Sequence, residues 1–202
     1  MQKNKHISKA RMARIMTEDA NFRVDGQAQN EKGIGLSDMA KWDCLTHREA
    51  NGKIISTFLL DISGLKSKDT VGDVIGNAAG GVAYLTQVTT AVNGLVYHIE
   101  IICVETPAVS SGNNTDDIDL ALGANGTKVY NNAHGGSLLV ETGAAWAAGD
   151  ARGTDVSAIS LIDGYLYLTS GEDAGDVGIY NAGKFIIRLH GLDPSTPSPL
   201  DF

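Results

Sequence analysis

The sequence predicts a mainly β protein, and three observations lead to this prediction. Residues 95–106 (LVYHIEIICVET) place apolar side chains at every second position, which is the period of a strand that buries one face. Residues 82–88 and 118–122 repeat the pattern on either side. The 24 glycines of the 202-residue chain fall mostly between short apolar runs, as in all-β proteins with many tight turns. The buried face expected for residues 95–106 consists of Leu95, Tyr97, Ile99, Ile101 and Cys103.

Short strands are predicted along most of the chain after residue 53. The pairs Asn51-Gly52 and Asp163-Gly164 are typical of hairpin turns, and residues 144–153 suit a short helix or a loop. Eight or nine short strands with glycine-rich turns favour a β-sandwich with jelly-roll topology, and a closed barrel is the alternative. The expected strands cover residues 54–62, 82–89, 95–106, 117–122, 127–130, 137–141, 155–162, 165–170 and 184–190.

The chain divides into three parts by composition. Residues 1–53 form a basic N-terminal arm, with a conditional helix over 8–20, followed by an irregular wrap without sustained periodicity. Residues 54–192 form the β-sandwich body. Residues 193–202 contain three prolines, which exclude a regular helix or central strand and predict an extended tail.

Charge is distributed unevenly between the arm and the body. Residues 1–24 carry six basic and two acidic side chains, so the rest of the chain has a net charge of −12 within a total of −8. A basic arm on an acidic body indicates that the arm binds an acidic partner, although a solvated, flexible terminus is equally compatible. The acidic body repels phosphate, so specific nucleic-acid binding is not expected.

The two cysteines and the hydropathy pattern indicate a protein made in a reducing compartment. Cys103 lies on the apolar face of the long strand, where a free thiol behaves as a small hydrophobe, and nothing in the sequence pairs it with Cys44. The basic N-terminus lacks the apolar core of a signal peptide. No apolar run approaches the roughly 18 residues of a membrane helix.

The search for a catalytic or metal site yields no candidate, so we expect neither an enzyme nor a cofactor. His134-Gly135-Gly136 resembles an oxyanion loop of esterases, but the chain lacks the Gly-x-Ser-x-Gly elbow that such a loop requires. The five histidines are scattered without helical or alternate-strand spacing. Two acidic groups offer oxygen ligands for calcium but do not match a calcium loop, and they suit turns. These groups are Asp116, Asp117 and Asp119, and Glu172, Asp173 and Asp176.

Four segments resemble virion structural proteins of tailed bacteriophages, particularly those of marine hosts. The segments are GGVAYLTQ at 80–87, ETP at 105–107, DIDL at 117–120 and GKFIIRLHG at 183–191. The resemblance implies a β-rich protein on the particle surface, most plausibly a capsid decoration or cement protein that binds the major capsid protein. It carries no catalytic residues across. On this interpretation the arm contacts the capsid shell through Lys3, Lys5, Lys9, Arg11 and Arg14.

Three classes of function follow, in decreasing order of preference. The first is a capsid decoration protein that lies on the phage head surface after assembly in the host cytoplasm. The second is a receptor- or glycan-binding fibre module, which requires an exposed aromatic platform; the candidates are Trp42, Trp146, Tyr165 and Tyr167. The third is an enzyme such as a polysaccharide lyase or esterase, for which the sequence shows no clustered catalytic groups. Open sheet edges make a homo-oligomer plausible, with a trimer as the expectation.

Overall fold

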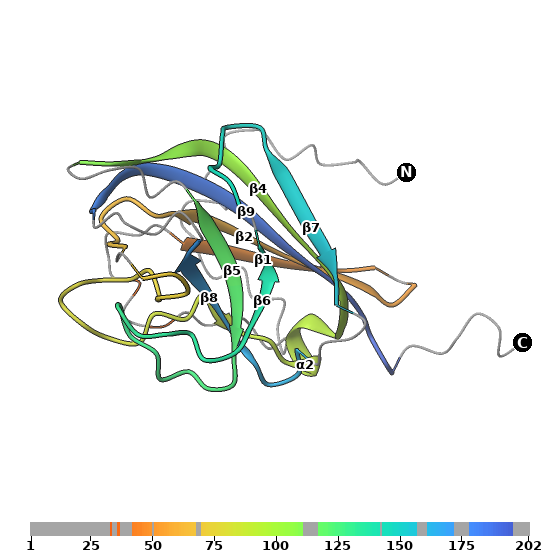
Figure 1. The fold of residues 1–202 in the computed structure, drawn as a ribbon. Coiled ribbons are helices and arrows are strands. Elements are labelled where there is room, and N and C mark those ends of the chain that lie inside the picture. The colour runs from red at the N-terminus through yellow and green to blue at the C-terminus, as the bar shows by residue number, and fades with distance from the viewer. Residues whose placement is uncertain are drawn as a thin grey trace, which may run out of the picture.

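Two antiparallel β-sheets make up the described part of the chain (Figure 1). This computed structural model describes residues 33, 36, 42–49, 51–67, 70–110, 117–141, 143–156, 161–171 and 178–195. The elements are β1 (Trp42–Arg48), β2 (Lys53–Asp61), β3 (Thr86–Gln87), α2 (Thr90–Asn93), β4 (Leu95–Val109), β5 (Ile118–Gly123), β6 (Ser137–Val140), β7 (Ala151–Asp155), β8 (Tyr165–Ser170) and β9 (Tyr180–Leu192).

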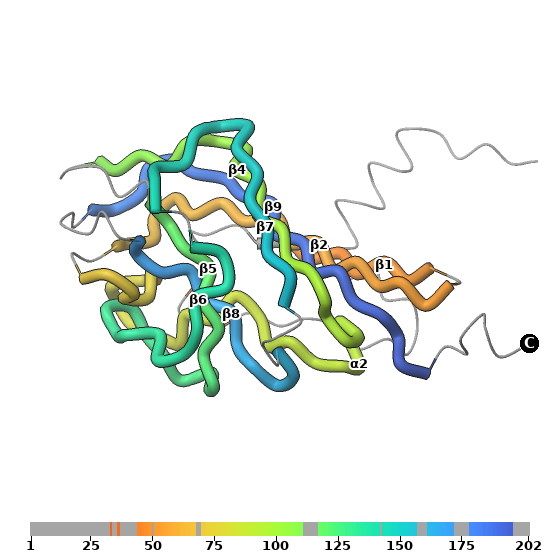
Figure 2. The backbone as a smooth tube through the Cα atoms, turned by 45° about the vertical axis from the view of Figure 1, so that its right-hand side comes forward, coloured from red at the N-terminus to blue at the C-terminus, as the bar shows by residue number. Residues whose placement is uncertain are grey.

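From β2 onward the chain passes from one sheet to the other at each strand, except between β5 and β6, which are neighbours in the same sheet. The five-stranded sheet has the order β1-β2-β9-β4-β7, and the four-stranded sheet has the order β3-β8-β5-β6. Within the five-stranded sheet, Trp42 lies opposite Leu60 at one end of β2, and Leu192 lies opposite Lys53 at the other end. The hairpin that joins β1 to β2 extends beyond the four-stranded sheet in both views (Figures 1 and 2).

One hydrophobic core fills the space between the inner faces of the two sheets. Phe58, Ile101 and Phe185 come from the five-stranded sheet, and Leu120 and Leu168 come from the four-stranded sheet. All of them are at most 2% exposed. Burial of this apolar area is the main stabilising contribution to the fold.

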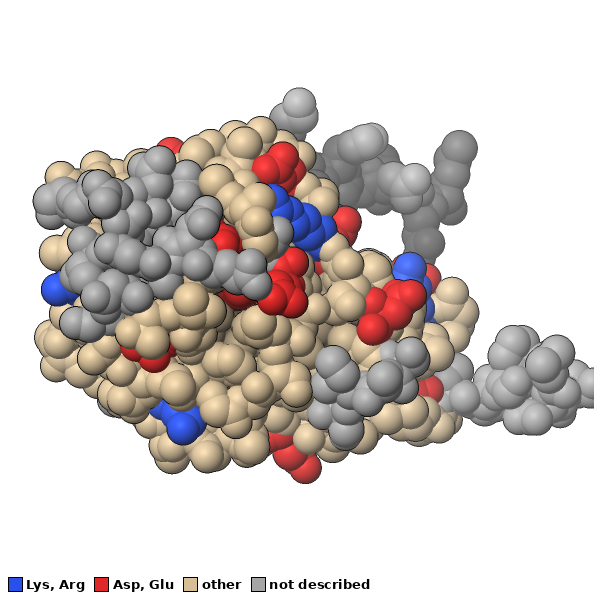
Figure 3. Space-filling model, viewed as in Figure 1, with Lys and Arg blue, Asp and Glu red and all other residues tan. Residues whose placement is uncertain are grey.

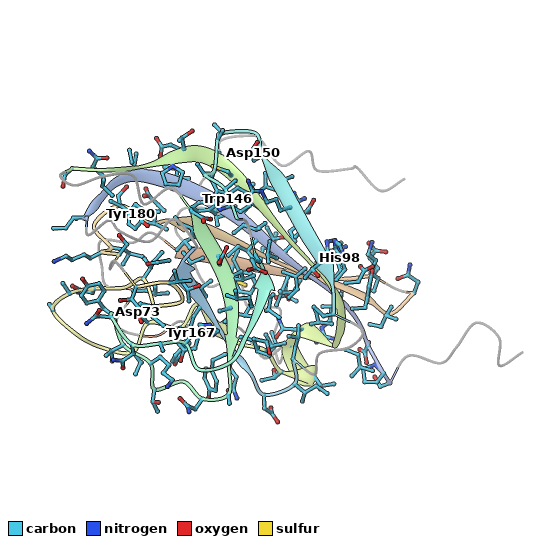
Figure 4. The ribbon with its side chains drawn as sticks, viewed as in Figure 1. Asp73, His98, Trp146, Asp150, Tyr167 and Tyr180 are labelled. Atoms are coloured by element: carbon cyan, nitrogen blue, oxygen red, sulfur yellow. The ribbon has the colours of Figure 1, made fainter. Side chains whose placement is uncertain are left out.

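Trp146, in the loop before β7, connects the two sheets within this core (Figure 4). Its indole Nε1 donates a 2.7 Å hydrogen bond to the carbonyl oxygen of Ile118 in β5. Its ring packs edge-on against Phe185 of β9 with centroids 5.6 Å apart, and the Arg152 guanidinium lies 4.4 Å from its ring centroid. One side chain thus bonds to one sheet and packs on the other.

Loops cover the outer face of the four-stranded sheet. Val74 and Ala83 pack there with Tyr167 of β8 in a second, smaller cluster. The Tyr167 hydroxyl donates a 2.7 Å hydrogen bond to the Asn125 carbonyl oxygen, and burial raises the pKa of this phenol. Gly33 donates a 2.8 Å backbone hydrogen bond to the Tyr84 carbonyl oxygen, so part of the predicted wrap also packs against this layer.

The short helix α2 is hydrogen-bonded to the projecting hairpin. Its N-cap Thr89 accepts a hydrogen bond from the Val92 N–H, and Gly94 ends it with a φ of 69°. The buried Asn93 side chain donates a 2.9 Å hydrogen bond to Ser56 of β2. Arg48 reaches the carbonyl oxygens of Ala91 and Val92 from the hairpin. These polar bonds fix the hairpin to the body.

The long apolar strand is confirmed, but its buried face is shorter than predicted. β4 lies between β9 and β7, and Ile99, Ile101 and Cys103 are buried as expected. Burial is the main cause that raises the pKa of the Cys103 thiol. Leu95 and Tyr97 are instead exposed. The register with β9 shifts between Val96 and His98, and such a bulge interrupts the alternation of faces.

Several other predictions need correction. Residues 42–48 lie within the predicted irregular wrap but form β1, which pairs with β2 over its whole length. The expected strand 82–89 reduces to β3, and residues 127–130 contribute only an isolated bridge at Val129. The expected strand 155–162 begins too late where it can be compared: β7 covers 151–155, residues 156, 161 and 162 are outside any strand, and residues 157–160 lie outside the described residues. Residues 144–150 form a loop. The strands expected at 54–62, 117–122, 137–141, 165–170 and 184–190 are present with small shifts of their ends.

Candidate interaction surface

The outer face of the five-stranded sheet is the candidate functional surface. Alternate residues of β2, β4 and β9 point away from the core, and their exposure alternates with that of the buried residues. Among the described residues, nine large hydrophobic side chains are exposed, and six of them lie on this face. These six are Leu45, Leu59, Leu95, Tyr97, Val104 and Leu192. An apolar concentration of this kind is typical of a contact surface.

An aliphatic row crosses the middle of this face. Leu59 of β2 lies opposite Ile186 of β9, and Ile186 lies opposite Ile102 of β4. Leu59 is 49% exposed, and the two isoleucines are half-buried. Ala151 of β7 continues the row beside Ile102.

Charged side chains on β9 and β4 form two columns of opposite sign. Arg188 of β9 binds Glu100 of β4 at 2.9 Å, and Lys184 of β9 binds Glu105 of β4 at 2.7 Å. The hydrogen bond from Lys184 is the main cause that lowers the pKa of Glu105, and the Gly183 N–H also contributes. The same hydrogen bond raises the pKa of Lys184. The positive column therefore lies directly beside the negative column.

Three histidines occupy one row at the end of the face near the hairpin. His47, His190 and His98 lie on β1, β9 and β4, with Ile55 of β2 between the first two. The His98 and His190 rings have centroids 5.5 Å apart. His98 Nδ1 lies 2.7 Å from Asp155 Oδ1, beside the C-terminal end of β7 (Figure 4).

Two local features place these rings. The bulge at Tyr97 turns His98 to the outer face, and Tyr97 lies near the His190 ring with centroids 6.3 Å apart. Gly153 of β7 lies under the His98 ring, because a Cβ at this position would lie 3.0 Å from His98 Nε2. The histidine row thus depends on a bulge and a glycine that no sequence period reveals.

We expect His190 and His134 to make the free energy of unfolding decrease as the pH falls. Burial, followed by the neighbouring His98 and Lys53, lowers the pKa of His190. Burial and Lys128 lower the pKa of His134. A folded-state pKa below the unfolded value of about 6.5 favours the neutral ring, so this stability is present above about pH 6.5 and is lost as the pH falls through it.

Urea denaturation at about pH 7.5 and about pH 5.5 tests this expectation on both sides of the unfolded pKa. The free energy of unfolding is expected to be lower at the acidic pH. His190→Asn is expected to reduce the difference, and adding the distant His134→Asn is expected to reduce it further. If neither substitution changes the difference in the free energy of unfolding between the two pH values, this difference arises from other titratable groups.

Charge does not single out a binding region among the described residues on the side of the molecule drawn in Figure 3. In the view of Figure 3, Lys and Arg lie interspersed with Asp and Glu, without a large area of one sign. No group of three or more His, Cys, Asp or Glu side chains suited to a metal ion occurs among the described residues. Within the same residues, no helix is long and apolar enough to cross a membrane.

Comparison with known proteins gives no family assignment. No protein-family model, curated protein or solved structure matches the chain.

The residues predicted for the capsid-contact arm lie outside the described residues. These are Lys3, Lys5, Lys9, Arg11 and Arg14, and the expected helix over 8–20 and most of the tail also lie outside. The segments that carry the phage resemblance lie largely in the described structure and serve in turns and packing. They contain β3, the Glu105 bulge of β4, the start of β5 and most of β9.

As far as their residues are described, the aromatic platform and the acidic groups are not assembled as a site. Trp146 and Tyr167 are buried, Tyr165 packs edge-on against Tyr84, and the side chain of Trp42 is not described. Asp117 and Asp119 are buried at the start of β5, and the other four acidic residues lie outside the described ranges. His134-Gly135-Gly136 forms a turn in which the Gly136 N–H donates to His134 Nδ1. Cys44 and Cys103 do not form a disulfide.

Proposed function

We propose that this chain is a virion structural protein of a tailed bacteriophage, namely a capsid decoration or cement protein without enzymatic activity. In this role the basic arm binds the major capsid protein of the head shell, and the β body contacts neighbouring copies. The observation that carries the proposal is the outer face of the five-stranded sheet, where exposed aliphatic side chains and ordered charge columns provide area for protein contact.

We further propose that the two sheets form a β-sandwich of jelly-roll topology. A jelly roll is a long hairpin of eight strands that is rolled into two sheets. Its first strand therefore pairs with its eighth, its second with its seventh, its third with its sixth and its fourth with its fifth. With β1 set aside, β2 neighbours β9, β3 neighbours β8, β4 neighbours β7 and β5 neighbours β6. This order supports the proposal, and β1 is then an added strand at the β2 edge. Viral capsid proteins use jelly rolls, although lectins and cupins also do.

The resemblance to phage virion proteins supports the same role. Its segments contribute to the core, to turns and, through Glu105, Lys184 and Arg188, to the outer face of the five-stranded sheet, which is expected of a protein that works through shape. Attachment in many copies raises avidity without strong single contacts, and an arm that folds on binding covers a wide surface.

Deletion of residues 1–20 tests the proposal. We expect the shortened protein to be lost from purified phage heads, because the arm supplies the basic contacts to the shell. Band densities on gels of purified heads give the copy number. Unchanged occupancy contradicts an anchoring arm, and absence of the full-length protein from wild-type particles contradicts the virion assignment.

Two matched variants separate charge from chain length. Replacing the arm residues Lys3, Lys5, Lys9, Arg11 and Arg14 by Gln is expected to reduce occupancy. Exchanging Lys for Arg and Arg for Lys at the same five positions conserves the charge and is expected to keep occupancy near the wild-type level.

A further inference from the structure

The outer face of the five-stranded sheet differs in charge from the rest of the molecule. Its described side chains include three basic and four acidic residues, whereas the whole chain carries a net charge of −8. These residues are Lys53, Lys184 and Arg188, and Asp61, Glu100, Glu105 and Asp155. A nearly neutral face lets two such molecules approach each other there without the repulsion that their net charges otherwise produce.

The two charge columns make this face complementary to itself. Consider a two-fold axis that runs parallel to the strands, between β9 and β4, in the plane of contact. Rotation by 180° places β9 of one copy over β4 of the other at the same height along the strands. Arg188 then faces Glu100 of the second copy, and Lys184 faces Glu105 of the second copy, in both directions. An interface that pairs i with j and j with i is the isologous type of two-fold dimers.

The aliphatic row obeys the same symmetry. Ile186 of β9 faces Ile102 of β4 in the second copy, since the two residues are register partners in one chain. Leu59 of β2 lies over β7 of the second copy, where Ala151 and Gly153 leave room for its side chain. The roughly 30° angle between packed sheets is compatible with these contacts.

The size of the face suits a weak to moderate dimer. Four strands, from β2 to β7, span about 20 Å, and the nine residues of β2 span about 30 Å. The projected area is therefore about 600 Å² for each copy, near the roughly 800 Å² of a standard interface. We expect association in the micromolar range.

We propose that this face binds the same face of a second copy of the chain around a two-fold axis. The inference uses the surface named for the proposed function but does not rest on the virion assignment, because isolated protein suffices to test it. A two-fold dimer also differs in mass from the trimer expected from the sequence.

Sedimentation of the purified full-length chain, from about 1 to about 200 μM, tests the inference across the expected dissociation range. The wild type is expected to convert from monomer to dimer as the concentration rises. Leu59→Glu is expected to raise the dimer dissociation constant at least about tenfold, because it places a charge against the aliphatic row. The matched control is Ile162→Glu, since Ile162 is also 49% exposed but lies in a turn outside this face.

A charge exchange tests the columns directly. Arg188→Glu alone and Glu100→Arg alone are each expected to weaken the dimer, and the double variant is expected to restore it, because it reverses the sign at both positions. Circular dichroism checks that each variant is folded.

Three results would overturn the inference. One is a full-length wild-type chain that stays monomeric over the whole concentration range. This result overturns the inference even if a chain without residues 1–41 forms a dimer. The second is a trimer or dimer that Leu59→Glu leaves intact. The third is equal weakening by Leu59→Glu and Ile162→Glu.

Discussion

Replacing Trp146 by Ala is expected to lower the free energy of unfolding by about 3–5 kcal/mol, the range measured for large aromatic side chains in cores. Trp146 is 1% exposed and contacts both sheets, so its removal leaves a cavity between them. It also leaves the Ile118 carbonyl oxygen without the indole hydrogen bond. Urea denaturation followed by far-UV circular dichroism measures the change.

Two variants divide this loss into its parts. Trp146→Phe keeps an aromatic ring against Phe185 but removes the indole donor, so we expect a smaller loss of about 1–3 kcal/mol. Arg152→Gln removes the cation from the indole face and is expected to cost about 0.5–1 kcal/mol. A loss below about 1 kcal/mol for Trp146→Ala would show that this ring does not hold the sheets together.

Gly191→Ala is expected to destabilise the protein by about 3 kcal/mol, at the upper end of the cost of overpacking. A Cβ at this position in β9 would lie 2.0 Å from the Asn93 carbonyl oxygen at the end of α2. This carbonyl cannot rotate away as a side chain could, because Asn93 is hydrogen-bonded to Ser56 and the helix ends at Gly94. The urea midpoint is expected to fall with an unchanged slope.

Gly153→Ala is the comparison for Gly191→Ala. Gly153 is also a strand glycine, but its Cβ would lie 2.9 Å from the Ile99 carbonyl oxygen and 3.0 Å from the His98 ring, which can shift. We expect a cost of about 1 kcal/mol. Similar losses in the free energy of unfolding for the two variants would mean that the Asn93 backbone at the end of α2 shifts easily. The close contact at Gly191 would then not hold α2 in place.

The sequence predicted the strands that bury a complete face, because their two-residue period is strong. β2 and the centre of β4 are of this kind, whereas β8 is a short run that is buried on both faces. β1 was missed because it is an edge strand in which the polar residues Thr46 and Arg48 face the same side as Cys44. β7 was missed because Gly153 and Arg152 give it no apolar period.

The candidate surface was hidden from sequence reasoning for a different reason. Its histidine row and charge columns arise from the register between strands that are far apart in the sequence, such as His98 opposite His190. Each residue alone appears as a solvated polar position. The alternation of β9, in which Lys184, Ile186 and Arg188 point outward, was the one available signal, and it led only to the prediction of a strand over 184–190.

The register at the two ends of β2 has a consequence for fusion and labelling. β1 begins at Trp42, opposite Leu60 near the end of β2, and β9 ends at Leu192, opposite Lys53 at the start of β2. The two attachment points are separated by about 25 Å along the strand direction. A fluorophore or tag placed ahead of β1 and another placed behind β9 therefore start from opposite ends of the molecule.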